Sequence, residues 1–403
     1  MVCRPSFAAS AMCRIITARE ASFPAHRLRF FWTKCAASMA NAQSKYQSIS
    51  VNGRFLSQSI TGVQRYAVEL LNAIDRLLNS GQIEPIPVTV LVPRDAKAVP
   101  QWRSLRVQRV GRLTGQLWEQ IDLAFHARET LLFTPCGGAP LFHPCQVITI
   151  HDAAIFRTPH AYTAVYGTYY RVLQRLLARK AQHVITVSEF SRKELVEFLH
   201  LPKDKVSTTW NSGEHVLGFG RDETILEGHN LQKGAYILGV GSRNVNKNLD
   251  GLIGAMSFLG DMEIILAIAG GANSRIFGDV NRTGGQIREL GFVSDGELRS
   301  LYENAACFVF PSFYEGFGIP PLEALTLGTP VVVSRAASLP EVFGDAAVYC
   351  DPRSPRDIAE KIRFVLQGNA PDREAAQLHA SRFTWEYCAR QTWDILSRSI
   401  DCQ

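Results

Sequence analysis

The sequence predicts an α/β protein with two domains, each built on a parallel β-sheet. Its 403 residues exceed what one ordinary hydrophobic core holds, so two domains are expected. Short apolar runs alternate with helical patterns through both halves of the chain. The stretch from Cys307 to Ser334 shows the pattern best, because a strand, a glycine loop, a short helix and a second strand follow one another as one βαβ unit.

Apolar runs in the first half of the chain predict the strands of the first sheet. These runs lie at residues 49–51, 88–92, 133–134, 147–150, 184–187 and 206–211. Helical spacing of apolar residues predicts helices over 66–78 and 162–179, and residues 108–132 form an amphipathic stretch. Ser188 directly follows a strand and is the expected N-cap of a helix that ends at Leu199.

The second half repeats this alternation and predicts the second sheet. Strands are expected at 236–240, 264–270, 307–310, 331–333 and 346–350, with a further strand that ends at Gly291-Phe292-Val293. Helices are expected from Leu249, from a capping box at Ser294 and Glu297, from Pro320, over 354–366 and from Thr384. Residues 214–235 have little periodicity and lie between the two patterns. The predicted units are 1–48, 49–215, a linker at 216–235, 236–383 and a final helix at 384–403.

The composition is that of an ordinary globular protein, with 46% hydrophobic and 20% charged residues. Residues 1–38 hold five of the six net positive charges, so the body of the chain is almost neutral and nucleic acid is not an expected partner. No apolar run approaches the roughly 18 residues that span a bilayer. Nine cysteines show neither a C-x-x-C pair nor metal-ligand spacing, which predicts free thiols and a reducing, cytoplasmic compartment.

Residues 1–38 are set aside from the predicted fold. They are rich in Arg and Ser and poor in acidic residues, as transit peptides are. The alternative, which we favour, is an over-extended start with translation beginning at Met39.

The glycine loop after Phe310 has the composition of an anion site. Gly316-Phe317-Gly318 precedes a helix, so backbone N–H groups and the positive end of the helix dipole can meet a phosphate. Glu315 and Glu323 flank the loop, and carboxylates close to a phosphate suit sugar or ribose hydroxyls. The alternative is that Glu323 complements the helix dipole and that Glu315 is a solvated loop charge.

Two further segments follow predicted strands, where ligands bind in parallel sheets. His151-Asp152 follows the strand at 147–150; His151 is either a site residue or a histidine hydrogen-bonded at a strand end, and Asp152 either orients it or caps the next turn. The loop from Gly241 to Asn248 carries Arg243 and Lys247 before a helix, as a diphosphate site would.

The phrase SFYEGFGIPPLEAL, with seven residues between Glu315 and Glu323, resembles the E-x7-E motif of retaining nucleotide-sugar glycosyltransferases of family 4. TGVQRY at 61–66 and ITVSEFSRKEL at 185–195 also resemble members of this family, and the resemblance covers nearly all of 49–403. It implies the GT-B fold, in which two Rossmann-like domains face each other across a cleft. It also implies that the last helix crosses back to the N-terminal domain, which carries the acceptor.

The resemblance assigns roles to the matching residues. Glu315 would bind sugar hydroxyls, Glu323 the ribose hydroxyls, and His151 would contact the transferred sugar. The other implied contacts fall into three groups: the diphosphate and donor loop (Arg243, Lys247, Gly316, Phe317, Gly318 and Ile319), the nucleobase edge (Phe292 and Val293), and the acceptor loop (Thr61, Gly62 and Val63). Arg243 stands one position away from the family's usual place, so Lys247 either shares the diphosphate with it or binds alone. Without an Asp-x-Asp sequence, no metal and no cofactor beyond the nucleotide-sugar co-substrate are expected.

The expected activity is transfer of a sugar to a saccharide or lipid-linked saccharide, in cell-surface polysaccharide or lipopolysaccharide synthesis. Similarity to mannosyl- and rhamnosyltransferases makes GDP-mannose the first expectation for the donor. Basic residues at 171–180 either face an inner-membrane surface, to which the protein would bind peripherally, or form a solvated helix face. The alternative functions are a non-catalytic nucleotide-sugar binder, a GT-B nucleotide-sugar epimerase and an oxidoreductase. The last is suggested by Gly239-Val240-Gly241, which lacks the third glycine of its motif.

Overall fold

The computed structural model describes residues 46–97, 99–241, 244–270 and 287–401. The segment 1–38 and Arg243 lie outside these described residues.

The first sheet has seven parallel strands in the order β3-β2-β1-β4-β5-β6-β7. Its strands are β1 (Ile49–Asn52), β2 (Val88–Val92), β3 (Leu105–Arg109), β4 (Leu131–Thr134), β5 (Gln146–Thr149), β6 (His183–Thr186) and β7 (Val206–Thr208). The strand order reverses between β1 and β4. In parallel sheets the crevice at such a reversal, beyond the carboxyl ends of the strands, is the usual place for a ligand.

Helices and helical turns connect these strands and cover both faces of the sheet. They are η2 (Gly53–Ser57), α3 (Gly62–Asn79), α4 (Gly115–Leu117), the π-helix η3 (Trp118–Leu123), α5 (Ala124–His126), α6 (Ala154–Arg157), η4 (Pro159–Ala161), α7 (Ala164–Lys180), α8 (Glu189–Leu199) and η5 (Lys203–Lys205). Ser188 caps α8, its hydroxyl accepting from the Ser191 N–H. We call this sheet with its helices the first lobe.

The second sheet has six parallel strands in the order β10-β9-β8-β11-β12-β13. They are β8 (Tyr236–Val240), β9 (Ile265–Ala269), β10 (Ile287–Gly291), β11 (Cys307–Phe310), β12 (Val331–Ser334) and β13 (Val348–Cys350). The order reverses between β8 and β11, so the loops that follow these two strands are neighbours. We call this sheet with its helices the second lobe.

The segments of the second lobe begin after β7. They are η6 (Glu214–Gly218), α9 (Thr224–Gly228), η7 (Val245–Lys247), α10 (Leu249–Met256), α11 (Asp295–Asn304), α12 (Ile319–Thr326), α13 (Leu339–Phe343), η9 (Gly344–Ala346), α14 (Pro355–Phe364), the π-helix η10 (Val365–Asn369) and α15 (Arg373–Ala380). The last helix, α16 (Trp385–Asp401), packs against α3 of the first lobe. Two chain segments therefore cross between the lobes, one before η6 and one before α16.

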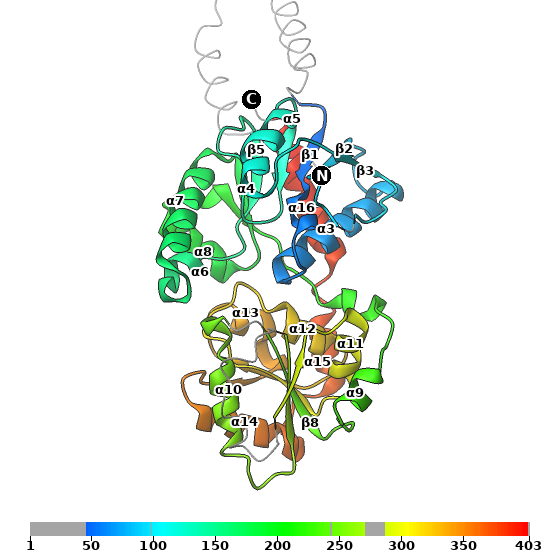
Figure 1. Cartoon of the computed structure of the whole chain (residues 1–403), viewed down its shortest axis with the longest axis vertical. Coiled ribbons are helices and arrows are strands. Elements are labelled where there is room, and N and C mark those ends of the chain that lie inside the picture. The colour runs from blue at the N-terminus through cyan, green and yellow to red at the C-terminus, as the bar shows by residue number, and fades with distance from the viewer. Residues whose placement is uncertain (1–45, 98, 242–243, 271–286, 402–403) are drawn as a thin grey trace, which may run out of the picture. The chain divides into compact units, whose positions relative to one another are not determined.

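Alternation along the strands divides the second lobe into two packed layers. Cys307 and Val309 of β11 face α10 and α14, which lie side by side in Figure 1. Phe308 and Phe310 face the opposite side, where α11 and α12 pack. This period of two is the pattern that the apolar run predicts for a strand buried on both faces.

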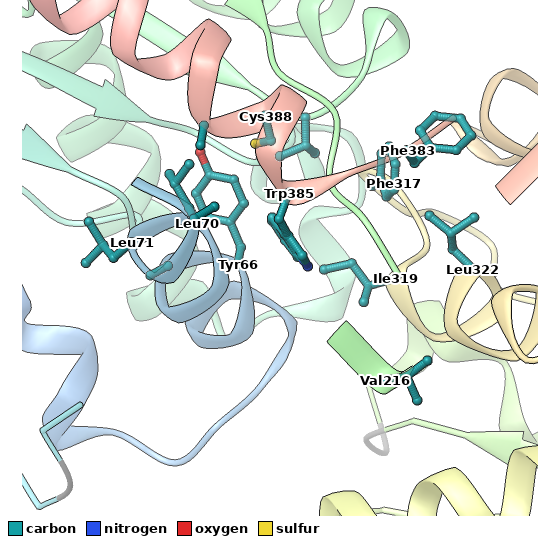
Figure 2. Close-up of a cluster of buried hydrophobic side chains, with 14 of the residues drawn as sticks. Tyr66, Leu70, Leu71, Val216, Phe317, Ile319, Leu322, Phe383, Trp385 and Cys388 are labelled. Carbon is teal, nitrogen blue, oxygen red and sulfur yellow. The ribbon is translucent and has the colours of Figure 1, made fainter. Parts of the chain in front are cut away.

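One apolar cluster joins the two lobes beside the crossing segments. In Figure 2, Trp385 of α16 lies between Tyr66 of α3 and Ile319 of α12. Phe317 packs edge-on against Phe383, with ring centroids 5.7 Å apart. All of these side chains are buried, so the start of the last helix belongs to the core of both lobes.

Two stretches of the chain contain elements that the sequence did not predict. β3 was not expected, because it is an edge strand in which only Leu105 is fully buried, so its residues carry little hydrophobic pattern. The segment 214–235, whose sequence has little periodicity, contains η6 and α9, and α9 packs on α11. Both elements are five residues long, which is too short for a periodic pattern to be recognised.

Candidate active site

The loops after β8 and β11 bring two predicted site residues into direct contact. The Lys247 ammonium lies 2.8 and 3.0 Å from the two carboxylate oxygens of Glu315. The same ammonium lies 5.1 Å from the centre of the Phe310 ring. An ammonium has three N–H donors, so one remains for a further anion while two bind Glu315.

The Asn248 side chain and the Asn246 backbone hold these two loops together. The Asn248 amide donates to the carbonyl oxygens of Pro311 (3.0 Å) and Pro352 (2.6 Å). The Phe313 N–H donates to the backbone carbonyl of Asn246 at 2.8 Å. Asn248 itself has a left-handed backbone (φ 52°), a conformation that asparagine tolerates better than most residues. The position of Lys247 is thus fixed from both sides.

The glycine loop fits closely against the first lobe. A Cβ on Gly316 would lie 3.0 Å from the Asp152 Cβ and 3.1 Å from the His151 carbonyl oxygen. Gly318 has φ 103° and precedes α12, so the left-handed turn that starts this helix requires a glycine. The His151-Asp152 pair after β5 therefore meets the glycine loop at the lobe boundary.

Glu323 has both of its oxygens engaged by protein. His215 Nε2 lies 2.8 Å from Oε1, and the Tyr302 hydroxyl donates to Oε2 at 2.9 Å. The residue is only 6% exposed. Burial by itself would raise the pKa of Glu323, but the hydrogen bonds from His215 and Tyr302 hold this pKa below its usual value. Glu323 is therefore a carboxylate at neutral pH, fixed in one orientation.

One partner of Glu323, His215, lies next to the crossing segments and is bonded to Trp385 at the start of α16. The indole N–H of Trp385 donates to His215 Nδ1 at 3.1 Å, and an indole can only donate. His215 consequently carries its proton on Nε2 and donates it to Glu323. Two more hydrogen bonds tie the crossings to each other: Ser212 Oγ to the Phe383 carbonyl (2.7 Å) and the Trp385 N–H to Glu214 Oε1 (2.7 Å).

A pocket of about 360 Å³ opens at the reversal point of the first sheet. It is lined by residues that follow β1, β4 and β5, by the start of α3 and by α7; they are Asn52, Arg54, Phe55, Gln58, Thr61, Val63, Gln64, Glu119, Cys136, Gly137, Gly138, Ile150, His151, Asp152, Ile155, Tyr162, Tyr166, Tyr170 and Gln174. The predicted residues Thr61, Val63 and His151 thus share one cavity. We call it the first-lobe pocket.

The two residues at the end of β5 have altered acidities. Burial lowers the pKa of His151 to about 4, so its imidazole is neutral at physiological pH. Its Nε2 faces the Pro135 carbonyl at 3.1 Å and carries the proton, which leaves Nδ1 as an acceptor. Burial raises the pKa of Asp152 to about 6. Asp152 Oδ1 accepts from the Ala154 N–H at 2.9 Å, so this side chain caps the following turn.

Other predicted site residues have different surroundings. The side chains of Phe317 and Ile319 are buried in the inter-lobe cluster, so only their backbone N–H groups remain for a ligand. Phe292 at the end of β10 is 85% exposed, and Val293 beside it is partly buried. At Gly62 an added Cβ would meet no atom within 4 Å. In the part of the chain that the structure describes, no group of three or more His, Cys, Asp or Glu could hold a metal ion.

Sequence reasoning missed several residues that hold the site. Glu119 is buried in the first-lobe pocket, between Asn52 (2.7 Å) and Arg54 (2.6 Å). His215 and Tyr302, the partners of Glu323, were also not predicted. None of these residues stands in a local motif, and each meets its partner only after the chain has folded.

The two halves of the chain match different family models. Residues 60–212 match the model described as Glycosyltransferase Family 4, and residues 222–381 match Glycosyl transferases group 1. O-antigen chain mannosyltransferase B of Escherichia coli is 35% identical over 263 residues, which cover 61% of this chain and 68% of that protein. O-antigen chain mannosyltransferase RfbU of Salmonella typhimurium is 27% identical over 372 residues, covering 87% and 97%.

Solved structures share the arrangement of the two lobes. Sucrose-phosphate synthase of Thermosynechococcus elongatus superposes with a TM-score of 0.70 at 19% identity, over 87% of this chain and 98% of that one. HepE of Anabaena, solved with UDP and glucose, gives a TM-score of 0.65 at 17% identity, over 87% and 99%. The fold is GT-B, as the sequence predicted, and the chain belongs to the glycosyltransferase family as a hexosyltransferase.

Proposed function

We propose that this protein transfers mannose from GDP-mannose to a saccharide or lipid-linked saccharide, with retention of anomeric configuration. The observation that carries the proposal is the contact of Lys247 with Glu315 at the reversal point of the second sheet. A cation for a diphosphate and a carboxylate for sugar hydroxyls stand next to each other there. The names of the two O-antigen mannosyltransferases support mannose as the sugar and cell-surface polysaccharide or lipopolysaccharide as the product.

The charge changes of the reaction match these residues. Breaking the bond between the anomeric carbon and the phosphate oxygen leaves negative charge on the nucleoside diphosphate. The third N–H of Lys247 and the backbone N–H groups at Gly316–Gly318 would stabilise that charge. Glu315 would hold the sugar hydroxyls, and His151 would accept a hydroxyl hydrogen through Nδ1. The Lys247–Glu315 contact orders both side chains before the donor arrives, which lowers the entropy lost on binding.

Glu323 would bind the ribose hydroxyls through lone pairs that His215 and Tyr302 leave free. A carboxylate offers about four acceptor positions, and the protein occupies two of them. Phe292 and Val293 would lie against the nucleobase. In this proposal residues 236–383 carry the donor and residues 49–215 the acceptor, and a resident metal is not required.

Peripheral binding to the inner membrane, from a cytoplasmic position, is the second part of the proposal. Exposed apolar side chains gather on neighbouring elements of the first lobe: Leu117, Ile121, Phe125, Phe142, Val165, Val172 and Leu176. Gln116 in α4 donates to the Tyr170 hydroxyl at 3.3 Å, and this hydrogen bond links α4 to α7. The basic residues Arg171, Arg175, Arg179 and Lys180 lie on the same helix. Exposed apolar side chains beside basic ones favour an anionic lipid surface. Among the described helices, none is both long and apolar enough to cross a membrane.

Donor turnover tests the catalytic proposal. Thermal stabilisation and sugar transfer are measured with GDP-mannose, UDP-glucose, UDP-N-acetylglucosamine and dTDP-rhamnose, each with and without EDTA. We expect GDP-mannose to stabilise and react without metal, and Lys247→Ala to lose both effects. Lys361→Ala is the control, because this lysine is in the same lobe and forms a partly exposed i,i+4 ion pair with Asp357 on α14. Binding without transfer to any acceptor would favour a non-catalytic binder, and a strict metal requirement would contradict the proposed site.

Flotation with vesicles tests the membrane proposal. We expect binding to anionic phosphatidylglycerol vesicles and weaker binding to neutral ones, and the substitution Val172→Glu should reduce it. Leu378→Glu in α15 is the control, since Leu378 is a similarly exposed apolar residue of the second lobe. Equal loss in both variants would contradict a binding surface on α7.

A further inference from the structure

The charges of the first-lobe pocket restrict what it can bind. Its lining contains one cationic side chain, Arg54, and the guanidinium is 2.6 Å from the Glu119 carboxylate. Asp152 adds a second carboxyl group, and His151, which also lines the pocket, is neutral at physiological pH. The lining therefore offers an incoming phosphate no uncompensated positive charge, and a second anion would be repelled.

The Arg54–Glu119 pair is held by its surroundings and is not a mobile surface contact. Glu119 is 2% exposed, and its other oxygen accepts from the Asn52 amide at 2.7 Å. A Cβ on Gly138 would lie 2.5 Å from Glu119 Oε2, so a glycine is needed beside the carboxylate. Breaking this ion pair would leave the buried Glu119 carboxylate without a cation, and an unpaired buried ion typically costs several kcal/mol. A phosphate is therefore a poor competitor for this guanidinium.

One wall of the pocket is aromatic. Tyr162, Tyr166 and Tyr170 are four residues apart, and their rings follow one another with centroid distances of 5.8 and 4.4 Å. Ring faces of this kind pack against the C–H groups of a pyranose. Next to them, the side-chain oxygen of Gln174 is buried and has no hydrogen-bond partner. A hydroxyl of a bound ligand would supply the missing donor.

We propose that the first-lobe pocket binds the terminal sugar of the acceptor, and that this sugar is uncharged. The inference rests on the proposed transferase function and deepens it. An acceptor hydroxyl would form the new bond to the anomeric carbon as the bond to the diphosphate breaks, and its proton would leave on a phosphate oxygen. The enzyme would then extend a glycan that already carries a sugar. A different transferase, one that places a first sugar on a lipid phosphate, would have to act before it.

The first experiment compares acceptors of the wild-type protein. The probes are octyl α-mannoside, as a neutral sugar, and farnesyl phosphate, as a lipid phosphate without a sugar. We expect mannosyl transfer to octyl mannoside and at least tenfold slower transfer to farnesyl phosphate. Transfer to farnesyl phosphate at an equal or higher rate would overturn the inference. Binding of octyl mannoside is also measured by calorimetry without donor. If the protein binds the glycoside but hydrolyses no donor, the proposed function is refuted and the assignment of the pocket is retained.

Two variants, one with a matched control, test whether the acceptor preference depends on the first-lobe pocket. Tyr166→Ala should raise the KM for octyl mannoside about tenfold and leave the KM for the donor and donor hydrolysis unchanged. Tyr169→Ala is the matched control, because it removes a tyrosine from the same helix that does not line the pocket. Glu119→Gln should leave Arg54 as a free cation and increase affinity for mannose 6-phosphate relative to mannose. Equal effects of Tyr166→Ala and Tyr169→Ala, or unchanged phosphate preference in Glu119→Gln, would contradict the assignment.

Discussion

Replacing Tyr302 by phenylalanine tests whether Glu323 is a buried, charged hydrogen-bond acceptor. The change removes the hydroxyl that donates to Glu323 Oε2 at 2.9 Å and leaves the ring in place. A hydrogen bond to a charged group contributes about 1.5–3 kcal/mol, against about 0.5–1.5 kcal/mol for a neutral pair. We therefore expect Tyr302→Phe to lower the free energy of unfolding at pH 7 by about 2 kcal/mol or slightly more.

Tyr236→Phe is the matched control for this variant. Tyr236 is also fully buried in the second lobe, and its hydroxyl donates to the neutral carbonyl of Leu301 at 2.6 Å. This substitution should cost about 1 kcal/mol. The two variants differ mainly in the charge of the acceptor, so the difference between them measures the contribution of the Glu323 charge.

The stability contribution of the charged Glu323 should also depend on pH. The folded-state pKa of Glu323 lies below its usual value, so its contribution to stability is present above about pH 4.5 and is lost as the pH falls through the folded-state pKa. In urea unfolding at pH 7 and pH 4, the deficit of Tyr302→Phe should shrink at the lower pH, while that of Tyr236→Phe should not. Equal deficits of both variants at both pH values would refute the reasoning.

Three further predictions concern the lobe boundary. Because the pKa of Asp152 is raised to about 6, its charge forms between about pH 5 and 7, and Asp152→Asn should remove an inflection near pH 6 from the pH–rate profile; an unchanged inflection would assign it to another group. Gly318→Ala should lower stability by at least about 1–3 kcal/mol in denaturant unfolding, because φ is 103° and the new Cβ would lie 2.7 Å from Leu339 Cδ2, whereas Gly228→Ala, where a Cβ meets no atom, should have little effect. Glu341 accepts from the N–H groups of Glu189 and Phe190 at 2.8 Å each, so Glu341→Gln should increase protease cleavage near the start of α8; an unchanged digestion pattern would show that this contact does not protect the helix.

The glycine loop after β11 and its flanking elements could be predicted from the sequence because they are contiguous. β11, the glycine loop, α12 and β12 fall within 28 residues, and proline and glycine mark both ends of the helix. His151 could be placed for a similar reason, since it lies two residues after a buried strand. Local pattern therefore sufficed for these two segments, although it did not single out Asn52 and Arg54 at the end of β1.

The partners of these residues could not be predicted, because they come from distant positions. His215 meets Glu323 across 108 positions, and Asn52 meets Glu119 across 67. Glu119 also lies in a π-helix, which has no clear sequence pattern. The sequence also did not reveal which way the loop side chains point. Phe317 and Ile319 stand in the predicted donor loop, but their side chains pack in the core.

The hydrogen bonds between the two crossing segments limit how the lobes can be exchanged between relatives. A hybrid enzyme with a new second lobe needs two junctions, one near Ser212 and one near Phe383, and both fall inside this bonded region. Helix α16 must remain with the first lobe, because it packs on α3. His215 and Trp385 must then come from compatible parents, since the carboxylate of Glu323 in the transplanted lobe depends on both. Chimeras that keep these residues together should fold, and those that separate them should lose donor binding before they lose the acceptor pocket.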